Sequence, residues 1–529
     1  MRILPSFSLP GRDSPVFRTK SISQLIDHTS GRHSLKRTLK PLDLLLLGIG
    51  AIIGTGIFVV TGIAAADYSG PALVLSFLIS GIVCIFAALC YAELSTLVPA
   101  AGSAYTYCYA SMGEIWAWII GWDLILEYGL AVAAVSIGWS GYAVHLAGAL
   151  GISLPVALTA PPGAEGGLFN LPAFLIVLFI TGLLVLGMRE SARVNAIVVG
   201  IKIAVVLLFV VLSVWSVDTA NWDPFMPFGW MGVFSGAAIV FFAYIGFDAV
   251  VTAAEEIENP QRSLPIGIIG SLAICMILYV VVSAILTGVV PYTMFQQEAA
   301  RSAPVAFALN FIGFPWAAAL VAIGAVCGMT SVLLVLLFGQ TRIFFAMSRD
   351  GLLPGIFRDV NPQSGSPVKA TLLVGCIVAA LAGLISLKSV ASLVNMGTLA
   401  AFMIVGCGVI LLRKKHPELP RPFRCPLVPW IPACCIISCL VLILSLGLLA
   451  QLLFVVWLAI GLTIYFLYGM QRHGRNTVPL EMNPTHPEPA FDLPEPRVPA
   501  SGSMTIPGPE ERGTSTGILR RGEREPETT

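Results

Sequence analysis

Apolar residues along this chain fall into twelve long runs, separated by short polar or glycine-rich stretches. A helical run of about twenty residues matches the ~30 Å hydrocarbon thickness of a bilayer. The runs show no regular alternation of polar and apolar positions, so helices are predicted rather than barrel strands. They fall approximately at 44–66, 71–91, 114–148, 171–187, 194–216, 231–255, 265–291, 314–346, 368–386, 391–412, 428–449 and 451–470. The pattern predicts an all-α polytopic membrane protein with twelve transmembrane helices.

Two polar segments flank the apolar region. Residues 1–43 carry mixed charges and contain no apolar core followed by a small-residue cleavage site, so we expect an uncleaved first helix. Residues 471–529 are rich in Pro, Glu, Gly, Ser and Thr, a composition that cannot bury enough apolar area to offset chain entropy. The predicted organisation is an N-terminal region (1–43), a twelve-helix domain (44–470) and a disordered tail (471–529).

The composition supports a membrane protein. Hydrophobic residues make up 57% of the 529 positions and charged residues 11%, against about 25% charged residues in a typical soluble domain. This balance excludes a soluble enzyme, a nucleic-acid binder and a disordered scaffold. Most of the 11 cysteines lie inside apolar runs, where thiols behave as small hydrophobic groups. We therefore expect no metal, no cofactor and no catalytic site.

The distribution of basic residues predicts the orientation. Twelve spans place both termini on one side of the membrane. If that side is cytoplasmic, 27 of the 30 Lys and Arg residues lie in cytoplasmic segments, and only Arg301 and Lys388 lie outside. An excess of Lys and Arg in cytoplasmic loops is the strongest rule for topology. We expect a multi-pass protein of the cell membrane with both termini in the cytoplasm. The remaining basic residue, Lys202, falls inside the fifth run.

The first run is interrupted near its centre. Gly48, Gly50, Gly54 and Gly56 occur within nine residues, the last two on either side of Thr55, and glycine weakens a helix. One interpretation is a small-residue surface for close helix–helix contact. The other is an unwound segment with free backbone groups, which at membrane depth is tolerated only where it lines a cavity or a ligand site.

The sixth run contains a similar interruption, where Gly246 and Asp248 follow an otherwise apolar stretch. The first and sixth runs occupy matching positions if residues 44–216 and 231–412 form two five-helix repeats of opposite insertion, followed by two extra helices over 428–470. Paired interruptions at matching positions are the best sequence indicator of a transporter substrate site.

Broken helices supply a specific chemistry. The N-terminus of a half-helix carries a partial positive charge that suits a carboxylate. The C-terminus of the facing half-helix offers free carbonyl oxygens to an ammonium group. Such a site can bind a zwitterionic α-amino acid through backbone groups alone, without charged side chains of the protein. We therefore predict a secondary active transporter of L-amino acids that works by alternating access. Alternatives are an amino-acid-sensing receptor or scaffold, and a sodium-independent facilitator or exchanger.

Three ionisable residues lie inside apolar runs, where charge is costly and therefore suggests function. Lys202 is interpreted as a fixed cation in place of a coupling sodium ion, as a proton carrier, or as a lysine near the membrane interface. For Glu127, in the third run, one interpretation is that it contacts the unwound segments or takes part in a proton path. The other is that it makes a structural hydrogen bond between helices. Asp248 either stabilises the sixth-run break or is structural. Met329, in the eighth run, lines a side-chain pocket or belongs to the core.

Three motifs resemble the amino acid–polyamine–organocation transporter superfamily. They are Gly48 to Phe58, Phe241 to Glu256, and the Ser-Arg-Asp-Gly-Leu-Leu-Pro sequence of residues 348–354. Residues 17–22 and 34–37 resemble its cationic amino acid transporter family in particular. The resemblance covers roughly residues 17–470 and implies the inverted-repeat fold with five plus five helices and two further spans.

The resemblance also implies roles for individual residues. Backbone groups of Ile52, Thr55 and Gly56 would bind the substrate carboxylate and amine, and Phe242, Ala243 and Ile245 would offer carbonyls to the ammonium. Lys202 matches the lysine that replaces sodium in proton-dependent relatives. Glu127 matches a family acid, and Met329 matches a pocket position. This branch includes carriers of neutral amino acids, and a methionine in the pocket resembles those with a smaller, less polar pocket. The expected partners are an L-amino acid, protons and the lipid bilayer.

Overall fold

The computed structural model describes most of the apolar region. The described residues are 39–98, 103–164, 166–187, 192–252, 254, 257–357, 359, 361 and 367–469. The chain divides into two compact units, residues 1–477 and 478–529, and every described residue belongs to the first. Most of the predicted N-terminal region and all of the predicted disordered tail therefore lie outside the described residues.

Helices dominate the described chain, and it contains no β-strand. This confirms the all-α prediction for these residues. The α-helices are α2 (Pro41–Ile52), α3 (Thr61–Ala64), α4 (Leu73–Leu97), α5 (Ser103–Ser111), α6 (Glu114–Ala149), α7 (Leu171–Val185), α8 (Ala192–Ser213), α9 (Gly229–Val240), α10 (Ala249–Thr252), α11 (Pro260–Val289), α12 (Glu298–Ser302), α13 (Pro304–Phe311), α14 (Pro315–Arg349), α15 (Val368–Leu384), α16 (Leu387–Lys415), α17 (Trp430–Ser445) and α18 (Leu448–Ile464).

Short π- and 3₁₀-helices fill many of the connections. The π-helices are η2 (Gly56–Val60), η3 (Ala65–Ser69) and η12 (Tyr465–Gly469). The 3₁₀-helices are η4 (Gly70–Ala72), η5 (Val156–Leu158), η6 (Val214–Ser216), η7 (Thr219–Trp222), η8 (Phe241–Tyr244), η10 (Tyr292–Gln296) and η11 (Gly355–Phe357).

Each of the twelve predicted runs coincides with helical segments of the structure. Within the described residues, seven helical stretches are long and apolar enough to cross a bilayer. One of them, Pro41–Leu97, covers both of the first two runs. Four further apolar helices are shorter: Leu171–Val185, Gly229–Tyr244, Val368–Leu384 and Trp430–Ser445. The number that cross the membrane therefore remains a prediction.

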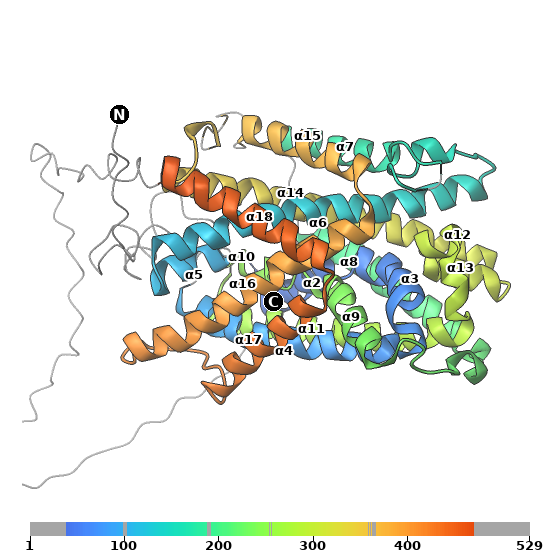
Figure 1. Ribbon diagram of the computed structural model, residues 1–529, viewed down its shortest axis with the longest axis horizontal. Helices are drawn as coiled ribbons and strands as arrows, with labels where there is room; N and C mark the ends of the chain where they lie inside the picture. The colour runs from blue at the N-terminus through green and yellow to red at the C-terminus, as the bar shows by residue number, and fades with distance from the viewer. Residues whose placement is uncertain are drawn as a thin grey trace, which may run out of the picture. The chain divides into compact units, whose positions relative to one another are not determined.

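The helices pack in pairs that are far apart in sequence (Figure 1). α6 lies beside α14, α7 beside α15, and α4 beside α11. In addition, α2 contacts α8 and α11, α9 contacts α4 and α16, α6 contacts α16, and α14 contacts α8. The two interrupted segments, α2–α3 and α9–α10, therefore lie between longer, continuous helices.

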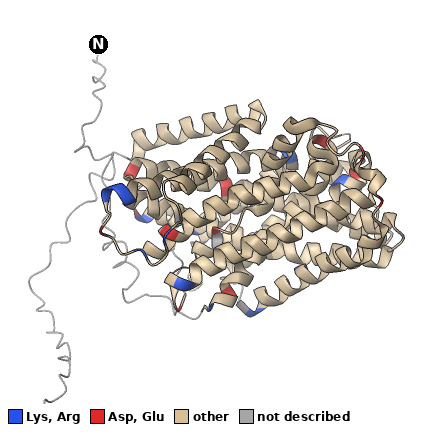
Figure 2. Cartoon of the chain, turned by 90° about the horizontal axis from the view of Figure 1, so that it is seen from below, with Lys and Arg blue, Asp and Glu red and all other residues tan. Residues whose placement is uncertain are grey.

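Most charged residues lie toward the two ends of the helices, and only a few acidic residues are seen in the middle of the bundle (Figure 2). Apolar side chains point outward along much of the helical surface, which includes Phe179, Ile277 and Leu449. A surface of this kind is compatible with lipid and is unusual in a soluble protein, which rarely exposes large contiguous apolar patches.

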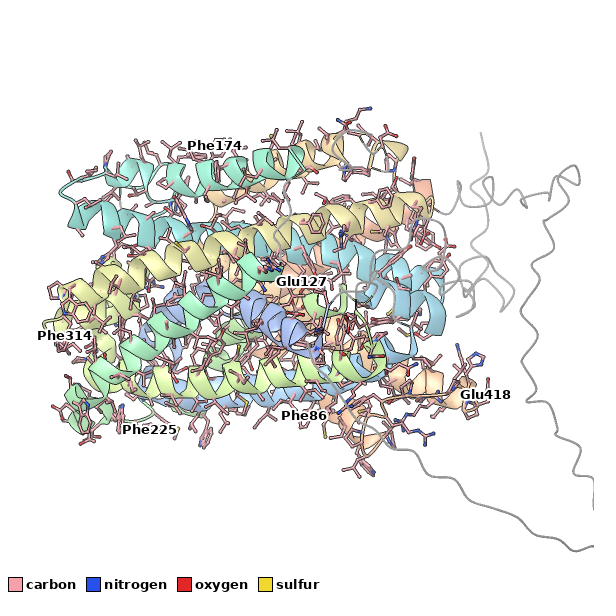
Figure 3. The ribbon with its side chains drawn as sticks, turned by 180° about the vertical axis from the view of Figure 1, so that it is seen from behind. Phe86, Glu127, Phe174, Phe225, Phe314 and Glu418 are labelled. Carbon is pink, nitrogen blue, oxygen red and sulfur yellow. The ribbon has the colours of Figure 1, made fainter. Side chains whose placement is uncertain are left out.

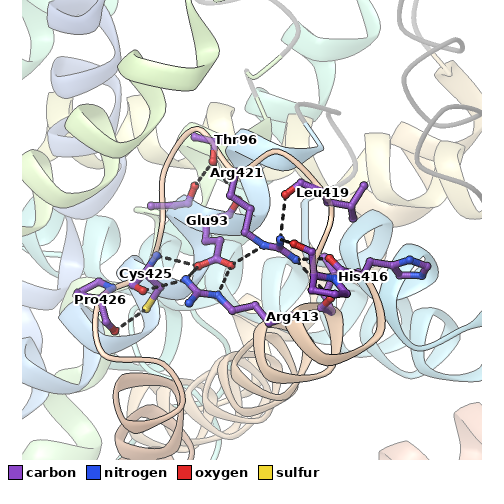
Figure 4. Close-up of polar contacts among 11 residues, drawn as sticks. Glu93, Thr96, Arg413, His416, Leu419, Arg421, Cys425 and Pro426 are labelled. Atoms are coloured by element: carbon purple, nitrogen blue, oxygen red, sulfur yellow. Dashed lines mark hydrogen bonds and ion pairs between the residues drawn. The ribbon is translucent and has the colours of Figure 1, made fainter.

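An ion-pair cluster joins the end of α4 to the loop after α16 (Figure 4). Glu93 is buried and accepts two hydrogen bonds from Arg413, at 2.9 and 2.6 Å. Arg421 lies 3.4 Å from the same carboxylate, and the Cys425 backbone N–H donates to it at 2.7 Å. Contact with the Cys90 thiol and burial raise the pKa of the Cys425 thiol. The cluster pins this loop to α4.

A second ion-pair cluster centres on Asp67 of η3. Arg301 of α12 donates to its carboxylate at 2.6 and 3.3 Å, and Lys388 at the start of α16 donates at 3.2 Å. The Lys388 ammonium also lies 4.9 Å from the centre of the Tyr68 ring. The two basic residues that the sequence predicts outside the membrane therefore converge on one carboxylate.

Candidate functional site

The first interrupted run breaks where the sequence predicts. α2 ends at Ile52, and Ile53 is extended, with φ −73° and ψ 103°. The chain returns to helical geometry at Thr55 and continues as the π-helix η2. Glycines on both sides of the break lower the helical propensity. The break gives α2 a free C-terminus and gives η2 a free N-terminus in the interior of the bundle.

The last carbonyl oxygens of α2 have no partners within the helix, because the chain leaves helical geometry after Ile52. The Lys202 ammonium donates to the Gly50 oxygen at 2.6 Å. The Tyr279 hydroxyl lies 2.9 Å from the Ile52 oxygen. Gly246 approaches Ala51 so closely that a Cβ there would lie 2.8 Å from the Ala51 oxygen. Groups from three other helical segments therefore meet the end of α2.

Lys202 is fully buried, so its side chain is directed into the bundle and not toward a surface. Its aliphatic stem packs against Gly328 of α14, where a Cβ would lie 2.8 Å from Lys202 Cε. A cation at the C-terminus of a helix is stabilised by the helix dipole. The ammonium therefore occupies the place where a cation best neutralises the broken end of α2.

The second interrupted run also leaves helical geometry. α9 tightens into the 3₁₀-helix η8, Ile245 is extended, and Gly246 has φ +116°, a conformation that side-chain-bearing residues rarely adopt. The Asn395 amide of α16 donates to the Ala238 and Ile239 oxygens at 2.7 and 3.1 Å, near the end of α9. A neighbouring side chain thus supplies hydrogen bonds close to the point where the helix changes geometry.

The two breaks cross at their backbones. A Cβ on Gly56 would clash with the Ala243 Cα, so only glycine permits this approach. The Tyr279 hydroxyl lies 2.9 Å from the Ile52 oxygen and 3.0 Å from the Ala243 oxygen, and so bridges the two broken segments. The prediction that both interruptions are unwound segments is confirmed. The structure brings Ile52, Gly56 and Ala243 together.

Residues of α6 and α14 cover one side of this crossing. The Thr55 hydroxyl lies 3.2 Å from the Met329 sulfur and 3.4 Å from the Val135 carbonyl oxygen. Gly138 lies against Thr55, and a Cβ there would be 2.7 Å from Thr55 Oγ1. Met329 is fully buried, as a core residue would be, but its sulfur reaches the first break.

Acidic residues lie on the other side of the second break. A narrow cavity, with no room for a water molecule, is lined by Glu127, Tyr128, Ala131, Ile245, Gly246, Asp248 and Leu336. Figure 3 shows Glu127 inside the bundle. The Tyr128 hydroxyl donates to Asp248 at 3.4 Å, and Glu127 contacts Thr398 of α16. Glu127, Ile245 and Asp248 therefore share one cavity.

Some predicted site residues have other neighbours in this conformation. The Phe242 oxygen accepts a hydrogen bond from the Ile245 N–H at 3.3 Å, within the tight turn of η8. The oxygens of Ile52 and Ala243 face Tyr279. Thr55, Phe242, Ala243 and Met329 are all buried, so the crossing is closed in this conformation.

Tyr279 and Asn395 contact the two broken segments, although the sequence pattern did not indicate them as site residues. Both carry polar groups inside apolar runs, and a buried tyrosine hydroxyl or amide must find a partner. That requirement marks them as candidates, but many partners in a bundle are possible. Only the folded chain identifies these partners as carbonyl oxygens of the two broken segments.

Comparison with known proteins identifies the family. The model of the amino acid permease family matches residues 39–469, which include both breaks and every helix described above. The chain belongs to the amino acid permease family. The resemblance of this permease to the amino acid–polyamine–organocation superfamily is thereby confirmed.

Relatives named for different substrates resemble this permease. It is 57% identical to a branched-chain amino acid permease, BcaP, of Bacillus subtilis over 87% of its own length and 98% of the relative's. It is 49% identical to a methylthioribose transporter of the same organism over 86% and 98% of the two chains. It is 41% identical to a vacuolar cationic amino acid transporter of Arabidopsis thaliana over 75% and 64%.

These relatives are transporters, and none of the three is named as an enzyme. The permease is therefore an integral, multi-pass membrane protein and an amino acid transporter, not an enzyme. Its sequence identity to the branched-chain amino acid permease of Bacillus subtilis is higher than that to the cationic amino acid transporter of Arabidopsis thaliana.

Proposed function

We propose that this permease carries neutral, branched-chain L-amino acids across the cell membrane by alternating access, coupled to protons. The observation that carries the proposal is the crossing of two broken helices, at which Gly56 meets Ala243 and Tyr279 bridges two carbonyl oxygens. Free backbone groups at this depth are costly in lipid, and broken helices of this kind build the substrate sites of secondary transporters.

The backbone around the crossing suits the two charged ends of an amino acid. The N–H groups at the start of η2, near Thr55 and Gly56, suit a carboxylate. The carbonyl oxygens of Ile52 and Ala243 are acceptors for an ammonium, and Ile245 lies beside them at the edge of the cavity. In this proposal the substrate ammonium shares these oxygens with the Tyr279 hydroxyl.

Paired packing supports the inverted repeat. The first five helices are taken as α2–α3, α4, α6, α7 and α8, and the next five as α9–α10, α11, α14, α15 and α16. Several contacts then have a counterpart five helices further on. The pairing of α2 with α11 corresponds to that of α9 with α4. The pairing of α6 with α16 corresponds to that of α14 with α8, and the pairing of α2 with α8 to that of α9 with α16.

The side-chain surroundings favour an apolar substrate. Met329 and Thr55 lie in contact at the first break, and a Cβ on Gly54 would meet only Val332, at 3.5 Å. Apolar walls favour apolar side chains through burial of their surface. The name of the 57%-identical branched-chain amino acid permease points to the same class of substrate.

Lys202 supports sodium independence. Its ammonium places a fixed cation 2.6 Å from the Gly50 oxygen at the end of α2, and so supplies there the charge that a coupling sodium ion would bring. Proton coupling is assigned to the buried acids beside the second break, Glu127 and Asp248. The excess of basic residues in the predicted cytoplasmic segments supports an orientation with both termini inside.

A competition uptake panel tests the proposal. The purified protein is reconstituted into liposomes, and uptake of labelled leucine is measured against every proteinogenic amino acid, with and without an inward proton gradient and with and without sodium. Competition by leucine, isoleucine and valine, accumulation driven by the proton gradient, and indifference to sodium are expected. Strict dependence on sodium, or the absence of competition by any amino acid, would contradict the proposal.

A second candidate substrate is methylthioribose, because 49% identity extends over nearly the whole of a transporter with that name. This thioether sugar has neither a carboxylate nor an ammonium group, so it makes no use of the two charged-group sites at the crossing. Including it in the panel separates the two functions: competition by methylthioribose without competition by amino acids favours the second candidate.

A further inference from the structure

Asp123 of α6 is a buried acid that the site described above does not use. Its side chain is 2% exposed, and among the described residues neither carboxyl oxygen has a hydrogen-bond partner. A buried polar group without a partner is rare, and a buried unpaired carboxylate is much more costly than a neutral acid. Burial without a partner therefore favours the protonated, uncharged form of Asp123.

Helix α16 holds the Asp123 carboxyl in place. A Cβ on Gly397 would lie 2.6 Å from Asp123 Oδ1, so this glycine leaves just enough room for the acid between α6 and α16. The next residue of α16, Thr398, contacts Glu127. Two successive residues of one helix therefore face the two acids, Asp123 and Glu127, of the other.

Asp123 and Glu127 lie on one face of α6. They are four residues apart, which is about one helical turn, or ~6 Å along the axis. Glu127 interacts electrostatically with Asp123 and with Asp248 across the cavity. The three acids form a row that leads from the second break toward the end at which α6 begins.

No basic group compensates Asp123 within the described residues. Besides Asp123, the titratable side chains on α6 and on the elements packed around it are Glu114, Glu127, Tyr128, Tyr142 and His145 of α6, Tyr105, Tyr107, Cys108 and Tyr109 of α5, Lys388, Cys407, Arg413, Lys414 and Lys415 of α16, Cys327, Arg342 and Arg349 of α14, Lys369 and Cys376 of α15, Glu298 and Arg301 of α12, and Asp248 beside the cavity. On α16, the basic residues lie at the ends of the helix, at least nine residues from Gly397.

We propose that Asp123 is a proton-binding residue of the transport cycle, an inference that rests on the proton coupling proposed above. When α16 packs against α6, the carboxyl is dry and holds a proton. When the two helices separate and water reaches the carboxyl, the acid ionises and the proton passes to water. Proton binding is thereby tied to the closing of one helix interface.

The test compares Asp123→Asn with Asp223→Asn, the same change at an exposed position outside the site. Both are reconstituted into liposomes beside the wild type. For Asp123→Asn we expect gradient-driven leucine accumulation to fall about ten-fold, the scale of a typical coupling free energy, while leucine counterflow without a gradient persists. Asp223→Asn is expected to match the wild type in both assays. Gradient-driven accumulation by Asp123→Asn that equals that of the wild type would overturn the inference and leave the proposed function intact.

An infrared measurement tests the protonation of Asp123 without relying on transport. The carbonyl stretching band of protonated carboxyl groups is recorded for the reconstituted proteins at neutral pH. We expect Asp123→Asn to lose part of this band, and Asp223→Asn to retain all of it. This loss supports the inference even if the wild type fails to accumulate leucine, a result that would refute the proposed coupling alone. An undiminished band in Asp123→Asn overturns the inference. If that variant does not fold, Asp123→Ser, which is smaller and equally unable to hold the proton, takes its place.

Discussion

Lys202 shows how one residue can serve both stability and mechanism. Its ammonium donates to the Gly50 oxygen, its stem packs against Gly328, and the side chain is fully buried. Removal of a buried cation from a helix end leaves carbonyl oxygens without a partner, which costs free energy of folding. In the proposed function, the same contact couples α8 to the first break, so the charge of Lys202 affects the shape of the substrate site.

Met329 gives a prediction at the residue scale. Because its sulfur touches Thr55 at the first break, Met329→Ser should enlarge the pocket and make it more polar. The expected result is a KM for leucine that rises about ten-fold, with a broader range of competitors, since losing a few methylene contacts costs roughly 1–3 kcal/mol. Competition uptake in liposomes measures this change.

Met329→Leu is the matched variant, because it conserves volume and apolar character. It should retain the competition profile of the wild type. An unchanged profile in both variants would place Met329 in the core and outside the pocket.

At the scale of elements, the breaks in the first and sixth runs depend on backbone contacts. Gly56 of η2 meets Ala243 of η8, and Gly246 meets Ala51 of α2. Tyr279 of α11 then joins the two segments through their carbonyl oxygens. Each break is therefore stabilised by the other, and changes in one should be transmitted to the other.

Gly246→Ala tests this mutual support. The residue has φ +116°, and a Cβ would lie 2.8 Å from the Ala51 oxygen, so alanine is strained there. We expect a loss of roughly 1–3 kcal/mol in the free energy of unfolding, together with a large fall in leucine uptake. Thermal unfolding in detergent and uptake in liposomes measure the two effects.

Gly182→Ala on α7 is the control, because no atom lies within 4 Å of the position its Cβ would take. Alanine in a helix is favoured over glycine by up to about 1 kcal/mol. Stability and uptake of this variant should equal or exceed those of the wild type. Equal behaviour of the two variants would show that Gly246 does not stabilise the break.

At the scale of the whole described domain, two ion-pair clusters tie the ends of the bundle. Glu93 joins α4 to the loop after α16, and Asp67 joins η3 to α12 and to the start of α16. Both clusters involve the ends of α16, the helix that also faces Asp123 and Glu127. Movement of α16 in a transport cycle therefore requires changes at one or both clusters.

Glu93→Gln should destabilise the protein strongly. Glu93 is buried and forms ion pairs with Arg413 and Arg421. Loss of its charge leaves both arginines without a counter-charge, which should lower the free energy of unfolding by about 3 kcal/mol. Thermal unfolding measures the shift. Asp359→Asn removes a carboxylate from an exposed pair with Lys369 and should cost less than about 1 kcal/mol. Similar shifts in the two variants would contradict the structural importance of Glu93.

Asp67→Asn should loosen the other end of the bundle. It removes the one charge shared by Arg301 and Lys388, so η3, α12 and α16 lose a common link. Spin labels on the exposed residues Gln297 and Ser389 report the separation of α12 from α16. A longer or broader distance distribution is expected in Asp67→Asn, whereas Asp223→Asn serves as an unlinked control. An unchanged distribution would show that the cluster does not hold these elements together.

Much of the fold could be predicted because each apolar run must satisfy its own backbone in lipid, which makes helices the default. The positions of both breaks were also predictable, since the glycine cluster of the first run and Gly246 with Asp248 in the sixth interrupt otherwise apolar helices. The predictions for Ile52, Thr55, Gly56 and Ala243 came through family resemblance, and the structure brings these residues to one crossing. Their functional roles remain proposals.

The sequence by itself determined what depends on local composition: the helices, the two interruptions and the charge asymmetry of the predicted loops. The tertiary structure decided which groups meet the exposed backbone, because partners such as Tyr279 for Ile52, or Lys202 for Gly50, are separated by 227 and 152 residues. It also decided that Asp123 lies without a partner against Gly397. Local propensity acts over a few residues, whereas a buried polar contact depends on how whole helices pack, and no short pattern in the chain contains that information.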